Sequence, residues 1–555
     1  MVRKIVFTIY FTLCVIYSNA QNLILDDIQL MDVQRNNELK KDTQKLGSSS
    51  FMIRSSSFFQ NHLENSRLSL KKSILKNFIF SYDQQENSLL PISYNDGNMF
   101  PARGWQERYS IGAHLQWKFI DINIQPEWLK VQNKDQEPYL GYPLDGNFAA
   151  KYFGLLYNRY DEFRQFGTGK IDTFNLGQSR IGIKTKFISL GVSNENIWWG
   201  PGKRNSLLMS NNAAGFKHLY IQNNQPIPSF VGNFEFSLIS GQLDTTWFKP
   251  WDTQILGDYQ QGAIQKNLDQ RNLHGATINW QPKWLPNLYI GYAYTRQSYK
   301  HARNEYGQAY TFFSKDKVYQ SFGSFMFRFL LPKDHAEFYG EIGLQDESAW
   351  PWKFFKEKRK AAFVIGVSKM VPLHKGRSWL GLNAEFAQLQ LMDPRYIYYR
   401  GILPFYGGPP NSWYSNNSTI LQGYTNNGQI IGASIGPGSN SQTIQLSWNK
   451  GLNKIGVQVD RVVHNNEINY QMYFNPYSAT GYSYYNRYWV DLSTSYYVQI
   501  APIKNILLTA SFVNTDALNY RWVRYEGWWD EASDADKFNK QFQLSIKYLL
   551  HAINE

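Results

Sequence analysis

The sequence has a single cysteine in its 555 residues, Cys14, which lies in a short apolar stretch near the N-terminus. Once that stretch is removed on export, no thiol remains. Disulfide bonds, thiolate catalysis and cysteine zinc sites are then excluded together. Charged residues are also few, at 18%. Apolar and aromatic residues are plentiful throughout the chain, which excludes intrinsic disorder.

Past residue 20, the chain lacks any apolar run near the roughly 18 residues that a membrane-spanning helix needs. Mean hydropathy is −0.47, so a polytopic helical membrane protein is excluded. Aromatic residues, in contrast, make up 17% of the chain. This share is high for a soluble protein and ordinary for a membrane β-barrel with aromatic girdles.

The first twenty residues have the layout of a secretory signal peptide, with an N-terminal membrane anchor as the alternative. Arg3 and Lys4 precede an apolar stretch at residues 5–17, and residues 18–20 are small enough for cleavage before Gln21. Cleavage removes two of the positive charges behind the net charge of +13. A basic exported protein has acidic glycans, lipopolysaccharide or a membrane surface as partners, rather than nucleic acid.

The rest of the chain shows the two-residue alternation of β-strands. At residues 443–449 an apolar set alternates with a polar one, and residues 455–459 repeat the pattern after a turn at residues 450–453. Residues 288–295 and 541–548 behave similarly. These patterns predict strands with one apolar face, and residues 443–449 and 455–459 together predict a hairpin. Because such segments recur as far as the C-terminus, a membrane barrel is favoured over a soluble β-sandwich.

We therefore predict an all-β fold, a transmembrane antiparallel β-barrel of about 16–18 strands at residues 100–555. Residues 21–99 are expected to form a small periplasmic segment that packs against or partly plugs the barrel, with a short amphipathic helix at residues 23–45. Two long segments rich in Gly, Asn, Ser and Tyr, residues 398–434 and 465–487, are predicted to be external loops.

The most distinctive stretch is residues 193–213, which contains Trp-Trp-Gly-Pro-Gly, then a short apolar run and Ser-Asn-Asn-Ala. It resembles the capsule-assembly Wzi family of outer-membrane proteins. Residues 95–104 and 125–128 resemble the start of the first barrel strand and the end of the second in that family. The chain departs from many outer-membrane barrels in not ending on an aromatic residue, since seven residues follow Tyr548. Either the last strand is longer than expected or the assembly signal is internal.

The resemblance implies an outer-membrane barrel of about eighteen strands with a periplasmic helical element. It also implies a lectin-like, non-enzymatic role, in which the protein holds exported capsular or other surface polysaccharide at the cell surface. A diffusion porin for small solutes is the alternative, and a glycan- or lipid-modifying barrel enzyme is a third class. We expect no cofactor and a monomer that contacts outer-membrane lipid.

Alternation before the motif places Glu195 in the lumen, where an unpaired acid is costly. Lys203 and Arg204 are its predicted basic partners. Trp198 and Trp199 offer flat faces on which sugar rings stack. Alternatively, Gly200, Pro201 and Gly202 form a structural corner that folds a loop inward, and the two tryptophans pack inside it. Both interpretations remain open at this level.

The candidate polysaccharide-binding or lumen residues are polar or aromatic side chains in two segments. They are Glu195, Trp198, Trp199, Lys203, Arg204, Asn211 and Asn212 in the motif, and Arg524, Trp528 and Trp529 near the C-terminus. The second group lies in an external saccharide-binding loop or in an aromatic girdle. Arg103, Glu127 and Glu385 are expected in ion-pair networks of the lumen.

Signals for catalysis and metal binding are weak. Residues 432–436 match G-x-S-x-G, but that motif requires a helix after the serine, and Pro437 and Gly438 favour a loop instead. None of the nine histidines forms H-E-x-x-H. The sequence therefore predicts neither a catalytic residue nor a metal ligand.

Overall fold

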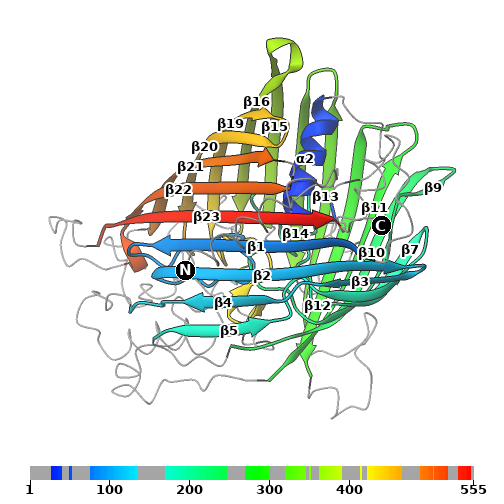
Figure 1. The fold of residues 1–555 in the computed structure, drawn as a ribbon. Helices are drawn as coiled ribbons and strands as arrows, with labels where there is room; N and C mark the ends of the chain where they lie inside the picture. Colours follow the sequence, from blue (N-terminus) through cyan, green and yellow to red (C-terminus); the bar gives the residue numbers. More distant parts are fainter. Residues whose placement is uncertain are drawn as a thin grey trace, which may run out of the picture.

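The computed structural model describes residues 27–40, 49, 51–52, 75–135, 169–246, 269–300, 319–345, 349, 351, 362–390, 413–414, 420, 422–465, 488–503, 505–522 and 535–551. Its main feature is a sheet of 21 strand segments that closes on itself, because β1 pairs with both β2 and β23. All neighbouring strands of the described wall are antiparallel, apart from an isolated parallel bridge between Gln125 and Gly177. Figure 1 shows this closure, with β1 lying between β23 and β2.

The first half of the wall contains the strands that are interrupted. Its segments are β1 (Leu75–Asn87), β2 (Gly104–Trp117), β3 (Ile120–Ile124), β4 (Glu127–Val131), β5 (Ile171–Asn175), β6 (Arg180–Lys184), β7 (Ile188–Ser193), β8 (His218–Asn223), β9 (Ile227–Ser229) and β10 (Gly232–Leu243). β3 and β4 both pair with β2, and β8 and β9 both pair with β10, while β5 and β6 pair with β4 and β3, the two parts of one split strand. Each pair is one wall strand split in two, so the described wall has 18 strands.

The second half is regular. Its strands are β11 (Arg271–Pro282), β12 (Leu288–Tyr299), β13 (Gln320–Leu331), β14 (Ala336–Gln345), β15 (Ala362–Leu373), β16 (Ser378–Gln388), β19 (Asn440–Lys450), β20 (Asn453–Val463), β21 (Val490–Ile503), β22 (Ile506–Leu518) and β23 (Lys537–His551). The predicted hairpin is confirmed as β19 and β20. The last strand continues three residues past Tyr548, so it is longer than the alternation predicts.

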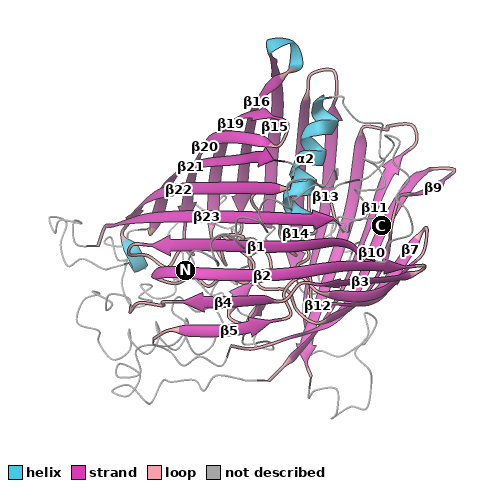
Figure 2. Cartoon of the chain, viewed as in Figure 1, coloured by secondary structure: helices cyan, strands magenta, loops and turns pink. Residues whose placement is uncertain are grey.

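The remaining elements are short. They are the helix α2 (Asp27–Lys40), a small hairpin of β17 (Thr425–Asn426) and β18 (Gln429–Ile430), and the 3-10 turns η5 (His374–Gly376) and η6 (Tyr520–Trp522). Figure 2 shows α2 as a cyan coil among the magenta strands. It lies inside the predicted helical segment at residues 23–45. No helix in the described ranges is both long and apolar enough to cross a membrane.

Alternation along each strand gives the wall an apolar outer face. In β19, Ile444 and Leu446 are exposed, whereas Thr443 and Ser447 are buried. An apolar outside and a polar inside are the pattern of an outer-membrane barrel, which confirms the predicted fold class. The predicted start of the barrel at residue 100 is wrong, however, because β1 already belongs to the wall. The alternation of polar and apolar residues from Ser81 to Gln85 is weak, so the sequence did not predict β1 as a strand.

Strand connections differ between the two ends of the barrel. At one end the turns are short, as between β19 and β20, and Lys454 beside that turn contacts Asp32 of α2. At the other end the connections are long, as between β20 and β21. Since outer-membrane barrels keep periplasmic turns short, α2 lies at the periplasmic end and the long connections lie at the cell surface.

Candidate functional site

The Trp-Trp-Gly-Pro-Gly segment belongs to residues 194–217, which leave the wall after β7 and return at β8. As predicted, Leu190 and Val192 of β7 face outward and Ser189 and Ser193 face inward. The chain therefore enters the lumen directly after Ser193. The backbone N–H of Trp199 donates to the carbonyl of Met209 at 3.1 Å, which closes the segment into an inward loop. We call residues 194–217 the inward loop.

Both tryptophans of the inward loop are packed away from solvent. Trp198 is 2% exposed and Trp199 is 1% exposed. Trp199 belongs to a hydrophobic core that also contains Leu207 of the loop and Phe322 and Val364 of the wall. Trp199 is enclosed by this core and presents no open face to a sugar ring, which favours the corner interpretation for it, whereas Trp198 also lines a hollow beside residues 31–40.

Gly200, Pro201 and Gly202 form a sharp corner. Gly200 has φ +151°, and a Cβ there would lie 2.9 Å from a carboxylate oxygen of Glu341. A Cβ on Gly202 would lie 1.8 Å from the carbonyl oxygen of Asn205. The carbonyl of Pro201 accepts a hydrogen bond from Arg35 of α2 at 2.7 Å. The corner thus needs glycine for steric reasons and is tied to the helix.

We expect Gly202→Ala to displace the inward loop and to lower the free energy of unfolding by about 3 kcal/mol or more. The added methyl group would meet backbone atoms, which cannot move aside as a flexible side chain could. Lys203 and Arg204 follow the corner, so trypsin should cleave there in the folded variant and leave the wild-type loop intact. Gly451→Ala is the control for backbone strain without overpacking, because Gly451 has φ +60° but a Cβ there meets no atom within 4 Å. Equal resistance of Gly202→Ala and wild type would contradict the steric argument.

Glu385 of β16 holds the far side of the inward loop. Its carboxylate accepts the backbone N–H groups of Lys203, Arg204 and Asn205 at 2.7, 3.1 and 2.8 Å. The hydroxyl of Tyr339 donates to it at 3.0 Å. The expected ion-pair role of Glu385 is therefore wrong, because its partners among the described residues are hydrogen-bond donors. Arg103 likewise donates to the carbonyls of Ser88 and Asp135.

Glu195 does face the lumen and does have a basic partner. That partner is Arg180 of β6, whose guanidinium lies 2.5 Å from Glu195 and 2.9 Å from Asp121. The predicted partners, Lys203 and Arg204, are elsewhere. Both lie beyond the corner, which turns the chain away from Glu195, so the identity of the partner was predicted wrongly.

Lys203 and Arg204 point to different parts of the lumen. Lys203 lies 3.6 Å from Asp32 and 3.5 Å from Glu337. Arg204 lies 3.6 Å from Asp460, and its guanidinium stands 4.9 Å from the ring of Tyr94. Lys203 therefore contacts residues on the periplasmic side of the lumen, and Arg204 contacts residues on the surface side.

Asn211 and Asn212 connect the inward loop to two other segments. Asn211 donates to the carbonyl of Asn95 at 2.9 Å, and Asn212 donates to that of Ile430 at 3.0 Å. The side chains of Arg524, Trp528 and Trp529 lie outside the described residues.

Part of the predicted external loop at residues 398–434 also folds inward. Tyr424 is buried against Phe322 of the wall, with ring centroids 4.5 Å apart, and Ile431 is buried in the core. Its sequence is rich in Gly and Asn, which suggested solvent exposure. Buried backbone is satisfied here by contacts such as the bond from Ser210 to the carbonyl of Ile431. The two inward segments together pack the lumen.

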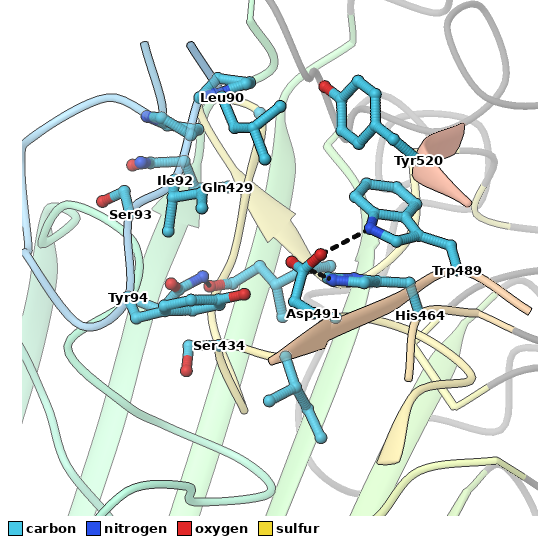
Figure 3. Close-up of a pocket in the computed structure, with 17 residues that line it drawn as sticks. Leu90, Ile92, Ser93, Tyr94, Gln429, Ser434, His464, Trp489, Asp491 and Tyr520 are labelled. Atoms are coloured by element: carbon cyan, nitrogen blue, oxygen red, sulfur yellow. Dashed lines mark hydrogen bonds and ion pairs between the residues drawn. The ribbon is translucent and has the colours of Figure 1, made fainter. Parts of the chain in front are cut away.

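A hollow of about 790 Å³, open solvent included, remains above this packing at the cell-surface end. We call it the mouth hollow. It is lined by residues from separate segments, namely Leu90, Pro91, Ile92, Ser93, Tyr94, Pro101, Asn212, Gly428, Gln429, Ile430, Ser434, Ile435, Gly436, His464, Trp489, Asp491 and Tyr520. Figure 3 shows Tyr94 across the hollow from His464, Trp489 and Asp491.

Aromatic rings and one carboxylate form a rigid wall of the mouth hollow. The rings of His464 and Trp489 stack with centroids 4.0 Å apart, and Tyr520 meets Trp489 edge-on at 4.9 Å. Asp491 accepts the indole N–H of Trp489 at 2.7 Å and lies 2.7 Å from a ring nitrogen of His464. The carboxylate thus fixes both rings, as the dashed lines in Figure 3 show.

The composition of the mouth hollow suits a saccharide. Tyr94 and Tyr520 are half-buried, and such rings provide apolar faces beside polar edges. Gln429 and Asn212 add carboxamides, which both donate and accept hydrogen bonds. Of these residues, the sequence predicted Asn212 and missed Tyr94, Tyr520 and Gln429. A signal was present, because His464 and Trp489 flank one predicted external loop and Tyr94 precedes the second resemblance segment.

Neither catalysis nor metal binding gains support from the described residues. Residues 431–439 are turns without a helix, so Ser434 does not sit on the strand–turn–helix that G-x-S-x-G requires. In the described ranges, no three His, Cys, Asp or Glu side chains are placed to hold a metal ion.

Comparison with known proteins agrees with this architecture. The profile of the family described as capsule assembly protein Wzi matches residues 110–518. Among solved structures, Wzi of Escherichia coli, described as a carbohydrate-binding β-barrel involved in group 1 capsule assembly, is 12% identical with a TM-score of 0.59. The match covers 95% of this chain and 99% of that one. At this identity the likeness shows the fold alone.

Two further barrels are more distant. OccAB2 of Acinetobacter baumannii is 9% identical with a TM-score of 0.40, over 87% of this chain and 100% of that chain. OprD of Pseudomonas aeruginosa is 9% identical with a TM-score of 0.38, over 88% of this chain and 98% of that chain. No curated protein matches the sequence.

Proposed function

The chain belongs to the family of capsule assembly protein Wzi, and on this basis we propose that it binds exported polysaccharide at the cell surface. The polymer is capsular or another surface glycan, and the protein retains it in the outer membrane without changing it chemically. Binding residues lie disproportionately on loops that a rigid scaffold positions, and in this barrel those loops are the long surface connections.

The mouth hollow is the observation that supports this proposal best. It lies at the cell-surface end, and its aromatic wall is held rigid by Asp491. A rigid aromatic site binds a flexible polymer with less loss of conformational entropy than a site that must order first. The packed lumen beneath the mouth hollow supports retention of the polymer outside the barrel, because the side chains of the inward loop fill the space through which a polymer would pass. The same packing argues against a diffusion porin.

We expect deletion of the gene to move polymer from the cell pellet to the medium while total production stays constant. The reason is that a retention factor acts after synthesis and export. The measurement is surface polysaccharide in washed cells and in the culture supernatant. Re-expression of the full chain is the control and should return the polymer to the pellet. An unchanged distribution would show that this protein does not retain the glycan.

A further inference from the structure

A second hollow lies at the opposite end of the barrel, beneath α2. It encloses about 1060 Å³, open solvent included, and its lining comes from α2, the inward loop and the ends of β19, β20 and β21. We call it the periplasmic hollow. The mouth hollow shares none of its residues. The packed core that includes Trp199 and Leu207 occupies the lumen, so the two hollows are separate.

Positive charge dominates the periplasmic hollow. Arg35, Lys40, Lys203 and Lys454 line it, whereas Asp32 is the one acidic residue in its lining. Asp32 lies 3.1 Å from Lys454 and 3.6 Å from Lys203. Two lysines therefore share one carboxylate.

The acids behind the lining do not balance this charge. Glu337 is buried and lies 3.0 Å from Arg35, 2.7 Å from Arg328 and 3.5 Å from Lys203. One carboxylate is thus divided among three cations. Glu38 lies 2.8 Å from Arg328 as well, so it adds no charge next to the lysines. The cluster keeps an excess of buried positive charge that faces the hollow.

Two observations indicate that the contacts of Lys203 and Arg35 do not fully offset their burial. Burial lowers the pKa of Lys203, because lost hydration, together with repulsion from Arg35 and Lys454, outweighs the attraction of Glu337 and Asp32. The Nε atom of Arg35 is buried without a hydrogen-bond partner among the described residues. An incoming anion would supply both the charge and the acceptor that are missing.

Carboxamides surround the charged cluster. Asn36 and Asn37 of α2 and Gln445, Asn449 and Gln499 of the wall line the same hollow. Side-chain amides donate and accept at once, so they match hydroxyl groups, which do the same. A small inorganic anion would contact the cationic side chains and leave the carboxamides without hydrogen bonds to the ligand. An anion that also carries hydroxyl groups would contact the cations and the carboxamides together.

We propose that the periplasmic hollow is a second binding site, which takes an acidic sugar residue carrying a carboxylate or phosphate group. The two lysines and the amide side chains named above would hold it. This inference rests on the proposed function, because it assumes that the ligand is a glycan. It adds that the protein contacts glycan from the periplasmic side as well as at the surface.

The experiment is binding of trigalacturonate to the purified full chain in detergent, with neutral maltotriose and inorganic phosphate as comparison probes. We expect trigalacturonate to bind more weakly as salt increases, since Lys454 contributes through its charge. Lys454→Gln should weaken binding about tenfold, the size expected for one lost charge-assisted hydrogen bond. Lys450→Gln is the matched control, because Lys450 is exposed on the same turn and outside the hollow.

The outcomes separate this inference from the proposed function. A loss in Lys454→Gln that Lys450→Gln does not show, and that is also seen in the Tyr94→Ala background, supports the periplasmic site. Loss only on truncation of Tyr94 places acidic sugar at the mouth, which overturns this inference and leaves surface retention standing. Equal binding of phosphate and trigalacturonate identifies a simple anion site and overturns the saccharide assignment. Failure of the proposed function would appear instead as unchanged polymer distribution in deleted cells.

Discussion

Glu385→Ala is expected to turn a barrel that conducts few ions into one that conducts steadily. In the wild type, the carboxylate of Glu385 binds three consecutive backbone N–H groups of the inward loop, from Lys203 to Asn205. Alanine leaves these buried donors without an acceptor, and each such group costs about 1–3 kcal/mol. The loop should then leave its position against β16.

A total loss of about 3 kcal/mol would shift the ratio of packed to open lumen by roughly a hundredfold. The measurement is single-channel conductance in planar bilayers, with uptake of a small hydrophilic dye by whole cells as a second readout. Glu385→Gln keeps one carbonyl oxygen as an acceptor, so its effect should be intermediate.

Glu86→Ala provides the matched control. Glu86 lies in β1 and its side chain is exposed. The Glu86→Ala substitution therefore removes the same charge as Glu385→Ala but leaves the inward loop unchanged. We expect it to behave as the wild type does. If Glu385→Ala inserts normally but conducts no more than Glu86→Ala, the carboxylate is not what keeps the loop in the lumen.

Removal of Tyr94 and Tyr520 together is expected to release polysaccharide from cells. These half-buried rings lie at the mouth hollow, where Tyr520 also packs against Trp489. An aromatic contact contributes about 0.5–1.5 kcal/mol beyond its buried area. Two such contacts with a sugar repeat would therefore change affinity about ten- to a hundredfold.

The measurement pairs binding of the purified polymer with its distribution between cells and medium. Trp448→Ala is the control, because Trp448 belongs to the apolar outer face of β19 and is 37% exposed. It removes an aromatic side chain at the lipid side only. Normal retention in the Tyr94→Ala, Tyr520→Ala double variant would place the glycan site away from the mouth hollow. Tyr94→Phe, which keeps the ring, should retain more polymer than Tyr94→Ala.

The wall of the barrel could be predicted well from the sequence, because membrane strands need a two-residue alternation. Residues 443–459 show it plainly, and they form the hairpin of β19 and β20. Where the alternation is weak, the prediction was wrong. β1 carries Ser81, Asp83 and Gln85 on its inner face, but its outer residues include Tyr82 and Gln84, so it did not stand out from a polar segment.

The contents of the lumen could be predicted only in part. The inward turn after Ser193 could be predicted from the alternation and from Gly200 to Gly202. The ion pair of Glu195 with Arg180 could not be predicted, because the register of β6 and β7 is what brings these two residues together. The inward position of residues 422–434 was also missed, because a Gly- and Asn-rich composition is shared by exposed loops and by backbone packed in a lumen.

Taken alone, the sequence determined the barrel class, the parity of each clear strand and the presence of a glycine corner. These are local properties, since each depends on neighbouring residues and on the two-residue period of a strand. Tertiary structure alone decided which charges meet. It placed Lys203 beside Asp32 and Glu337, Glu385 against three backbone donors, and Tyr94 opposite Trp489. Those contacts join residues more than a hundred positions apart, and closure of the wall is what brings them together.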